Sequence, residues 1–268
     1  MKRLASKKCE PSGGFVDGAE ADSNELTSRA GNVHSGSFLR LSMKRDWKLV
    51  WFSMLHSGGK FPRGFLFGWL LFLIVSALVI VPYDFALFEV IRRESPAGTR
   101  NFVKFLSQAG KFEYLNLIGT FILLGLAHLK NDRWLRRVAM SFFVASALAG
   151  ISVQIVKPLV GRPRPTQCIE QQIESTDLNG PTLKKRFHSY PSGHTATTVA
   201  AVSVLAIAFP RFILACILAG LITAWARISG KSHFPIDTLH GAVLGYLCAY
   251  LSTRWLRKSR LRIRSRCS

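Results

Sequence analysis

The sequence predicts an all-α, polytopic membrane protein whose core is a bundle of six transmembrane helices. Hydrophobic residues make up 49% of the 268 residues and charged residues 19%, so the chain as a whole is too apolar to be intrinsically disordered. The apolar residues are also gathered into six blocks, which leave too little polar surface to cover a soluble all-α domain. These blocks are Phe65–Val81, Phe112–Leu129, Val138–Val156, Ser192–Phe209, Phe212–Ala226 and Thr238–Leu256.

The lengths of the blocks can be compared with the thickness of a bilayer, which a helix of about 20 residues crosses, with roughly 17–25 tolerated. The first three blocks meet this length directly. The fourth and fifth are shorter, and we expect their helices to continue into the flanking polar residues. The sixth carries His240 near its start, which we interpret as a buried or hydrogen-bonded side chain.

Four regions follow from this division. Residues 1–42 are rich in Gly, Ser, Ala and charge and are predicted to be a disordered basic tail. Residues 43–64 are predicted to be an interfacial amphipathic lead-in, residues 65–256 the membrane domain, and residues 257–268 a basic C-terminal tail. The lead-in places apolar side chains on one helical face: Trp47, Val50, Trp51, Met54 and Leu55. The basic N-terminus is not followed by an apolar run until about residue 65, so no cleavable signal peptide is expected.

The formal net charge of +21 is distributed in a way that predicts orientation. Lys and Arg gather in the short segment 130–137 and in the tail 254–266, on the same side of the predicted membrane as the N-terminus. Because positive segments mark the cytoplasmic side, we expect both termini to be cytoplasmic. Contact with anionic lipid headgroups then accounts for the excess charge, so nucleic acid is not expected as a partner.

Three polar clusters occur at predicted span ends, and all three fall on the outward side. The first runs from Lys157 to Pro165 where the third span ends, and the second from Tyr190 to His194 where the fourth begins. The third, Arg227 to Asp237, joins the fifth span to the sixth. Six spans do not by themselves require such convergence, so we predict a functional site at the periplasmic face of an inner membrane.

The cations of these clusters are suited to an oxyanion. Lys157, Arg164 and Arg227 supply one ammonium and two guanidinium groups, which match the spread charge of a tetrahedral anion. Ser192 and Gly193 open a helix, whose free N–H groups and positive dipole end also favour an anion. Arg162 lies beside the first cluster, and we expect it either to contact a headgroup or to be solvated.

The histidines and the aspartate of these clusters predict acid–base or nucleophilic chemistry. His233 and Asp237 are four residues apart at a helix start, so the carboxylate is expected to fix the imidazole tautomer and leave the other nitrogen reactive. We then expect His194, on a different helix, to be the proton donor. Together with His240, the same two residues also form a possible zinc set. The surrounding cations oppose this reading, so no metal and no cofactor is expected.

In their order and spacing the three clusters resemble the type-2 phosphatidic acid phosphatase superfamily, which includes the vanadate haloperoxidases. The family pattern is Lys-x6-Arg-Pro, then Pro-Ser-Gly-His, then Ser-Arg-x5-His-x3-Asp. The resemblance extends over residues 65–256, and the position before the motif arginine is Ala226 instead of Ser, which removes one supporting hydrogen bond. The matching residues here are Lys157, Arg164 and Pro165, then Pro191 to His194, then Arg227, His233 and Asp237.

The resemblance implies a metal-independent phosphoric monoester or diphosphate hydrolase. It assigns the attack on phosphorus, with a phosphohistidine intermediate, to His233, the orientation of that histidine to Asp237, and protonation of the leaving oxygen to His194. It assigns the binding of the phosphate oxygens to Lys157, Arg164, Ser192, Gly193 and Arg227.

A phosphate at the membrane face indicates a lipid phosphate substrate. Undecaprenyl diphosphate, phosphatidic acid, phosphatidylglycerol phosphate and a lipid A phosphate all fit, and a prenyl diphosphate is favoured. A lipid phosphotransferase with the same site, an anion transporter and a non-catalytic membrane scaffold are the alternatives. The polar loop 167–187 is expected to select headgroups or to cover the site, and the sequence indicates no oligomeric state.

Overall fold

The computed structural model describes residues 63–93, 101–103, 105 and 116–264. The predicted tail 1–42 and nearly all of the lead-in 43–64 lie outside the described residues. The residues that are described form helices and connecting loops and contain no β-strand, in agreement with the predicted all-α class.

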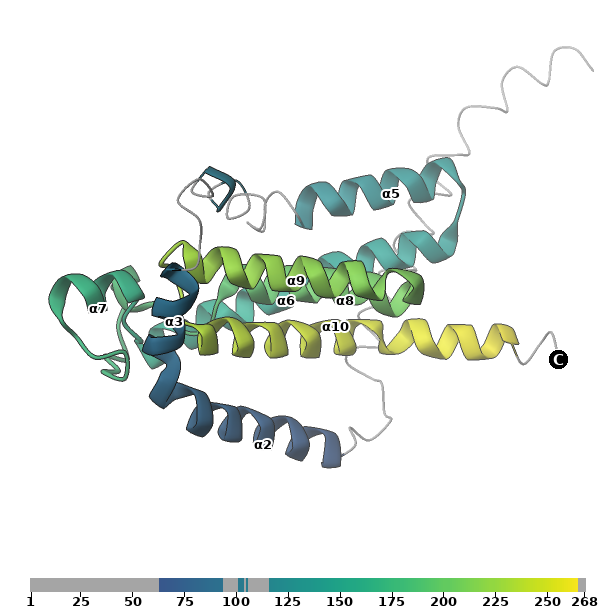
Figure 1. Cartoon of the computed structure of the whole chain (residues 1–268). Coiled ribbons are helices and arrows are strands. Elements are labelled where there is room, and N and C mark those ends of the chain that lie inside the picture. The colour runs from purple at the N-terminus through teal and green to yellow at the C-terminus, as the bar shows by residue number, and fades with distance from the viewer. Residues whose placement is uncertain (1–62, 94–100, 104, 106–115, 265–268) are drawn as a thin grey trace, which may run out of the picture. The chain divides into compact units, whose positions relative to one another are not determined.

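Each predicted apolar block corresponds to a helix (Figure 1). Hydrophobic side chains drive these segments together, and helices satisfy their backbone hydrogen bonds internally. The helix of the last block continues past the predicted end at Leu256. In chain order the helices are α2 (Arg63–Ile80), α5 (Gly119–Leu129), α6 (Arg133–Val160), α8 (Gly193–Ala208), α9 (Ile213–Ser229) and α10 (Pro235–Arg264).

Within the described part of the chain, three helical stretches are long and apolar enough to cross a membrane. They are Phe67–Arg93, Arg133–Gln171 and Pro210–Ser229. The stretches Asn116–Leu129 and Gly193–Ala208 are apolar but shorter. Large apolar side chains along α2 and α9 are exposed, which is the surface expected against lipid. Membrane insertion is therefore supported, and the count of six crossings stays a prediction.

The two ends of α6 are fixed by caps, and the second cap places the first polar cluster at the end of the bundle. The carboxylate of Asp132 caps the start by accepting hydrogen bonds from the N–H groups of Trp134 and Leu135. Gly161 ends the helix in the left-handed conformation with φ at 64°, and its N–H donates to the carbonyl of Lys157. The chain then turns sharply into Arg162 and the short helix α7 (Pro165–Gln171).

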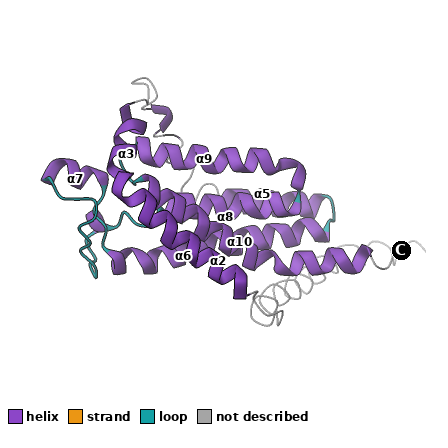
Figure 2. Cartoon of the chain, turned by 60° about the horizontal axis from the view of Figure 1, so that its bottom comes forward, coloured by secondary structure: helices purple, strands orange, loops and turns teal. Residues whose placement is uncertain are grey.

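Close packing of α8 against α10 sets the height of the second and third clusters relative to each other (Figure 2). A Cβ atom on Gly245 would lie 2.2 Å from the carbonyl oxygen of Ala196, and one on Gly241 would lie 2.6 Å from that of Ser192. The two backbones therefore touch, as small residues allow between membrane helices. At the end of this contact the N–H of Ser192 donates to the carbonyl of Asp237 at 2.9 Å.

A helix that the sequence did not predict follows α2. After the 3₁₀ turn η1 (Val81–Tyr83), the chain enters α3 (Asp84–Arg93), which runs at an angle to α2 and packs beside α9 (Figure 1). Phe88 of α3 is buried against Phe234, with ring centroids 5.6 Å apart. This contact brings Asp84 to the end of the bundle that carries the polar clusters, opposite the α5–α6 turn (Figure 1).

Candidate active site

Hydrogen bonds bring the three predicted clusters together at one end of the bundle. Arg162, just after α6, donates to the carboxylate of Asp237 on α10 at 2.6 Å. The start of α8 is tied to the same residue through the N–H of Ser192, at 2.9 Å. The ends of α6, α8 and α10 therefore surround a common region, although their polar residues are far apart in the sequence.

Three cations act electrostatically on His233 in this region. Burial, and after it the positive charges of Arg227, Lys157 and Arg164, hold the pKa of His233 well below its usual value of 6.5. The ammonium of Lys157 lies 3.6 Å from the position that a Cβ atom on Gly193 would occupy. The absence of a side chain at Gly193 thus leaves space beside this ammonium at the start of α8.

One N–H group of Arg164 makes no hydrogen bond within the described residues. This group is the buried Nε–H. A buried guanidinium N–H is costly to leave unsatisfied, so an anion that enters the site is the acceptor that this group lacks.

The imidazole of His233 is held in one tautomer. It is 1% exposed, and its Nδ1 lies 2.7 Å from the backbone carbonyl of Ser189. A carbonyl oxygen accepts hydrogen bonds and cannot donate them, so Nδ1 carries the proton. In the neutral ring that the lowered pKa favours, Nε2 then carries a lone pair. This is the protonation state required of a nucleophile.

The predicted hydrogen bond between Asp237 and His233 is not formed. The separation of His233 Nδ1 from Asp237 Oδ2 is 3.9 Å. Helix α10 begins at Pro235, so His233 precedes the helix and the four-residue spacing does not place the two side chains on one helical face. Ser189 connects them instead, because its hydroxyl donates to Asp237 Oδ2 at 2.6 Å while its carbonyl accepts from His233.

The expectation that Arg162 contacts a headgroup or is solvated is wrong. Its side chain is 4% exposed and donates to Asp237 at 2.6 Å, to Asp84 at 2.7 Å and to the carbonyl of Ser175 at 2.9 Å. The guanidinium also stacks over Phe234, 4.6 Å from the ring centroid. Its nitrogens are thus committed to the protein, and two carboxylates compensate its charge.

Asp84 and Ser189 are the residues that the sequence reasoning missed. Asp84 is buried, accepts from Arg162 and accepts from the backbone N–H of Ile236 at 3.0 Å, so it holds the start of α10. An ionisable residue directly after an apolar segment was the available signal, because such groups are costly in a membrane without a role. The sequence around Ser189 contains no comparable signal for its role.

The start of α8 places the second cluster. Ser192 is the buried N-cap residue, and its hydroxyl pairs with that of Thr195 at 2.9 Å instead of capping a backbone N–H. His194 follows Gly193 in the first turn and is partly exposed. Because a Cβ atom on Gly193 would lie 3.6 Å from the ammonium of Lys157, the start of α8 lies beside this cation.

His240 is buried and hydrogen-bonded, which confirms its interpretation. Its Nε2 lies 2.9 Å from the hydroxyl of Ser76, and its Nδ1 lies 2.8 Å from that of Tyr190. With both ring nitrogens in these bonds, His240 is not arranged as a zinc ligand with His233 and Asp237. Over the described ranges, no group of three His, Cys, Asp or Glu residues is placed to hold a metal ion.

Several known proteins are similar to this chain. Residues 138–261 match the family model of the PAP2 superfamily, and this range contains every predicted site residue. A lipid A 1-phosphatase of Rhizobium etli is 25% identical over 188 residues, which are 65% of this chain and 78% of that protein. An undecaprenyl-diphosphatase of Sulfolobus acidocaldarius is 24% identical over 193 residues, or 69% and 87%.

A solved structure shares the fold. It is the crystal structure of the first transmembrane PAP2 type phosphatidylglycerolphosphate phosphatase from Bacillus subtilis, with a TM-score of 0.52 and 17% sequence identity. The similarity covers 71% of this chain and 95% of the other.

Proposed function

We propose that this chain, which carries a PAP2 superfamily domain over residues 138–261, is a membrane lipid phosphatase that forms a phosphohistidine on His233. One observation carries the proposal. His233 has its proton held on Nδ1 by Ser189, and its neutral ring lies within the field of three cations. Its Nε2 lone pair is therefore available to attack phosphorus, while the cations attract the phosphate.

In the first half-reaction the Nε2 lone pair of His233 forms a bond to phosphorus, and the bond from phosphorus to the leaving oxygen breaks. His194, in its protonated form, gives that oxygen a proton. Lys157, Arg164 and Arg227 stabilise the charge that spreads over the three remaining phosphate oxygens. Ser192 and Gly193 contribute the helix start to the same oxygens.

In the second half-reaction water hydrolyses the phosphohistidine. His194, now neutral, takes a proton from the attacking water, the bond from phosphorus to Nε2 breaks, and inorganic phosphate leaves. His233 returns to its neutral state with the Nδ1 proton still directed at Ser189. Asp237 supports this cycle through the hydroxyl of Ser189, which keeps the carbonyl acceptor of His233 in position.

The substrate class is a lipid monophosphate or diphosphate. The exposed apolar surfaces of α2 and α9 support a site reached from within a membrane, where a phosphate belongs to a lipid headgroup. The names of the relatives, a lipid A phosphatase and an undecaprenyl-diphosphatase, support the same class. Within it we propose a prenyl diphosphate ahead of phosphatidic acid, phosphatidylglycerol phosphate and lipid A phosphates.

The test is phosphate release by the purified full-length chain in detergent with EDTA, over a panel of these lipid phosphates. Release of inorganic phosphate in the presence of the chelator is expected, and a requirement for added divalent metal would contradict the metal-independent mechanism. With ³²P-labelled substrate, transfer of label to a second lipid instead of to water would assign the phosphotransferase alternative. Acid-labile label on the protein is expected during turnover and should be absent from His233→Ala.

A further inference from the structure

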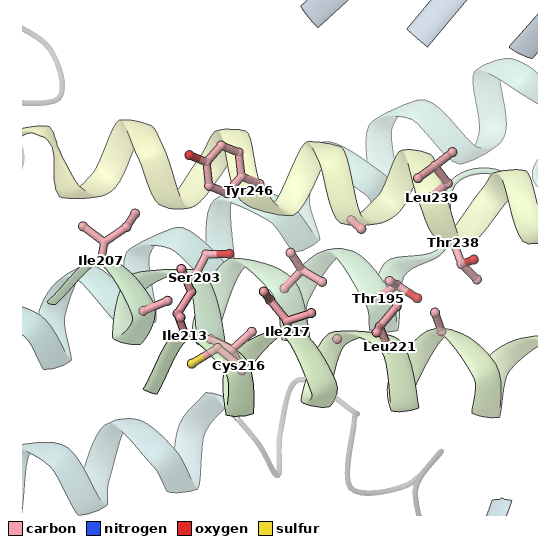
Figure 3. A pocket seen from close by; sticks show the side chains of 16 residues that line it. Thr195, Ser203, Ile207, Ile213, Cys216, Ile217, Leu221, Thr238, Leu239 and Tyr246 are labelled. Atoms are coloured by element: carbon pink, nitrogen blue, oxygen red, sulfur yellow. The ribbon is translucent and has the colours of Figure 1, made fainter. Parts of the chain in front are cut away.

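A long apolar groove lies between α8, α9 and α10 (Figure 3). Its volume is about 560 Å³, within the range of sites that hold small molecules. The lining is almost entirely hydrocarbon, and polar side chains such as Thr195 and Ser203 are few among the residues that face it. Water in such a space makes few hydrogen bonds, so an apolar occupant is favoured.

One end of the groove adjoins the proposed phosphate site on all three helices. On α8 it is lined by Thr195, whose hydroxyl bonds to Ser192 at 2.9 Å. On α9 it is lined by Ala224, about one turn before Arg227, and on α10 by Thr238, the residue after Asp237. A ligand whose phosphate sits among the cations would thus have this groove directly behind it.

The groove then follows the helices away from the site. Figure 3 shows Thr195 and Thr238 at one end and Ile207 and Ile213 at the other. The positions from Thr195 to Ile207 on α8 correspond to about 18 Å at 1.5 Å per residue. This is a slot for an extended chain, since a compact headgroup would leave most of its length empty.

The groove also opens sideways onto the apolar surface of the bundle. Two of its lining residues, Leu221 on α9 and Tyr246 on α10, are 60% and 45% exposed. The neighbouring outward side chains of α9, such as Leu214 and Leu218, are exposed and apolar as well. A hydrocarbon chain in the surrounding lipid can therefore enter between α9 and α10 without crossing water.

We infer that this groove binds the hydrocarbon chain of the lipid phosphate and so sets the depth at which its phosphorus meets His233. The inference rests on the proposed function and adds to it a selection by chain length. Because the surrounding lipid is as apolar as the groove, the gain is in positioning and not in hydrophobic transfer. Chains that fill the groove present the phosphate in register, and short chains do not use it.

The test shortens the groove at two depths and measures phosphate release from n-alkyl phosphates between butyl and hexadecyl in detergent. Ala206→Phe blocks the end far from the site, and Ala242→Phe blocks the middle. Ala206→Phe is expected to lower kcat/KM for hexadecyl phosphate on the order of tenfold and to leave butyl and octyl phosphate within about twofold, because misplacement costs rate. Ala242→Phe is expected to extend the loss to octyl phosphate.

The matched control is Ala215→Phe. Ala215 is exposed on α9 and does not line the groove; it lines a neighbouring hollow between α5, α8 and α9. Ala215→Phe therefore adds the same side chain to the bundle outside the groove. This variant should show the same dependence of kcat/KM on alkyl length as the unmodified protein. Equal losses for butyl and hexadecyl phosphate in Ala206→Phe, no loss for either, or the same profile in Ala215→Phe would overturn the inference.

A second measurement needs neither a variant nor turnover. Hexadecyl phosphate with a terminal diazirine is photolysed with the unmodified full-length chain, and the labelled residues are identified by mass spectrometry. Labels are expected near Ile207 and Ile213 and should be displaced by excess hexadecyl phosphate. Labels spread over the exposed face of α2 would overturn the groove assignment. Failure of the unmodified chain to release phosphate from any substrate would instead overturn the proposed function.

Discussion

The side chain of His233 derives its reactivity from neighbours that are remote in sequence. Ser189 fixes which ring nitrogen carries the proton, and burial beside Lys157, Arg164 and Arg227 disfavours the protonated ring. In the proposed mechanism, the cations that bind the phosphate therefore also disfavour protonation of the nucleophile. Under this proposal, substrate binding and nucleophile activation both depend on one cluster of charges.

Removal of the two catalytic histidines is predicted to have unequal effects. His233→Ala should lower phosphate release by roughly 10⁴-fold or more, as loss of a nucleophile does in other hydrolases. His194→Ala should lower it by about 10²–10⁴-fold, the usual contribution of a general acid–base group. His188→Ala, in the loop before α8, is the control and should retain activity. Rates measured with the preferred lipid phosphate check this order, and comparable activity in His233→Ala and His188→Ala would contradict it.

The pH dependence follows from the lowered pKa of His233. The nucleophile must be neutral, so the acid limb of kcat/KM is predicted to lie below pH 6.5, and the basic limb to follow deprotonation of His194. Because the unfolded chain binds this proton and the folded chain does not, His233 should also lower stability as pH falls below 6.5. Arg227→Gln should move the acid limb upward while reducing the rate. An unmoved limb in this variant would contradict the electrostatic account.

The buried ion pair of Arg162 is predicted to contribute more to stability than a partly exposed one of similar length. Asp84→Ala leaves part of a buried guanidinium charge uncompensated and should lower the free energy of unfolding by about 3 kcal/mol. The control is Glu89→Ala, which removes a pair of 2.6 Å to the partly exposed Arg92, against 2.7 Å for Arg162 and Asp84. Thermal unfolding in detergent should show a smaller effect for this variant, and equal shifts would count against the network.

Among the helices, the contact between α8 and α10 controls the geometry of the site. Both helices carry site residues in their first turns, and backbone contact at Gly241 and Gly245 fixes their relative height. The unpredicted helix α3 adds a second constraint, because Asp84 binds the N–H of Ile236 at the start of α10. Residues that have no contact with phosphate in the proposed mechanism, such as Gly241, Gly245 and Asp84, thus hold the site in place.

A side chain in this helix contact is predicted to reduce both stability and activity. Gly245→Leu would place its Cβ about 2.2 Å from the carbonyl of Ala196 and should cost about 1–3 kcal/mol or more of unfolding free energy. The matched control is Gly125→Ala on α5, where an added Cβ meets nothing within 4 Å and helix propensity favours alanine. Unfolding temperatures and phosphate release are compared in detergent, and unchanged values for Gly245→Leu would contradict the packing role.

For the whole membrane domain, the positive segments predict orientation. The segment 130–137 and the end of α10 lie at the opposite end of the bundle from the site, so a cytoplasmic location for them places the site at the periplasmic face. Fusions of green fluorescent protein and of alkaline phosphatase after Arg264 test this in a bacterial host, in the His233→Ala background. Fluorescence without alkaline phosphatase activity is expected, and the reverse would invert the proposed topology.

Several features of this protein follow from local sequence. The six apolar blocks correspond to helices because hydrophobic segments of this length satisfy their backbone polar groups only by coiling. The three polar clusters could be identified because chemistry restricts which residue types bind an oxyanion, and their order matches a family whose model covers residues 138–261. The predicted ends of the helices were less accurate, since caps such as Gly161 extend α6 past the apolar run.

The roles of the polar residues within the site depended on packing between helices. Spacing suggested that Asp237 binds His233 directly, yet the start of α10 after His233 separates them and Ser189 takes that place. Arg162 has a sequence position typical of a solvated or headgroup-binding residue. In the structure it is buried, and its guanidinium donates to two carboxylates from other helices. Hydrogen bonds over such separations arise when the helices assemble, because burial leaves each polar group to find its partner among whichever elements lie beside it.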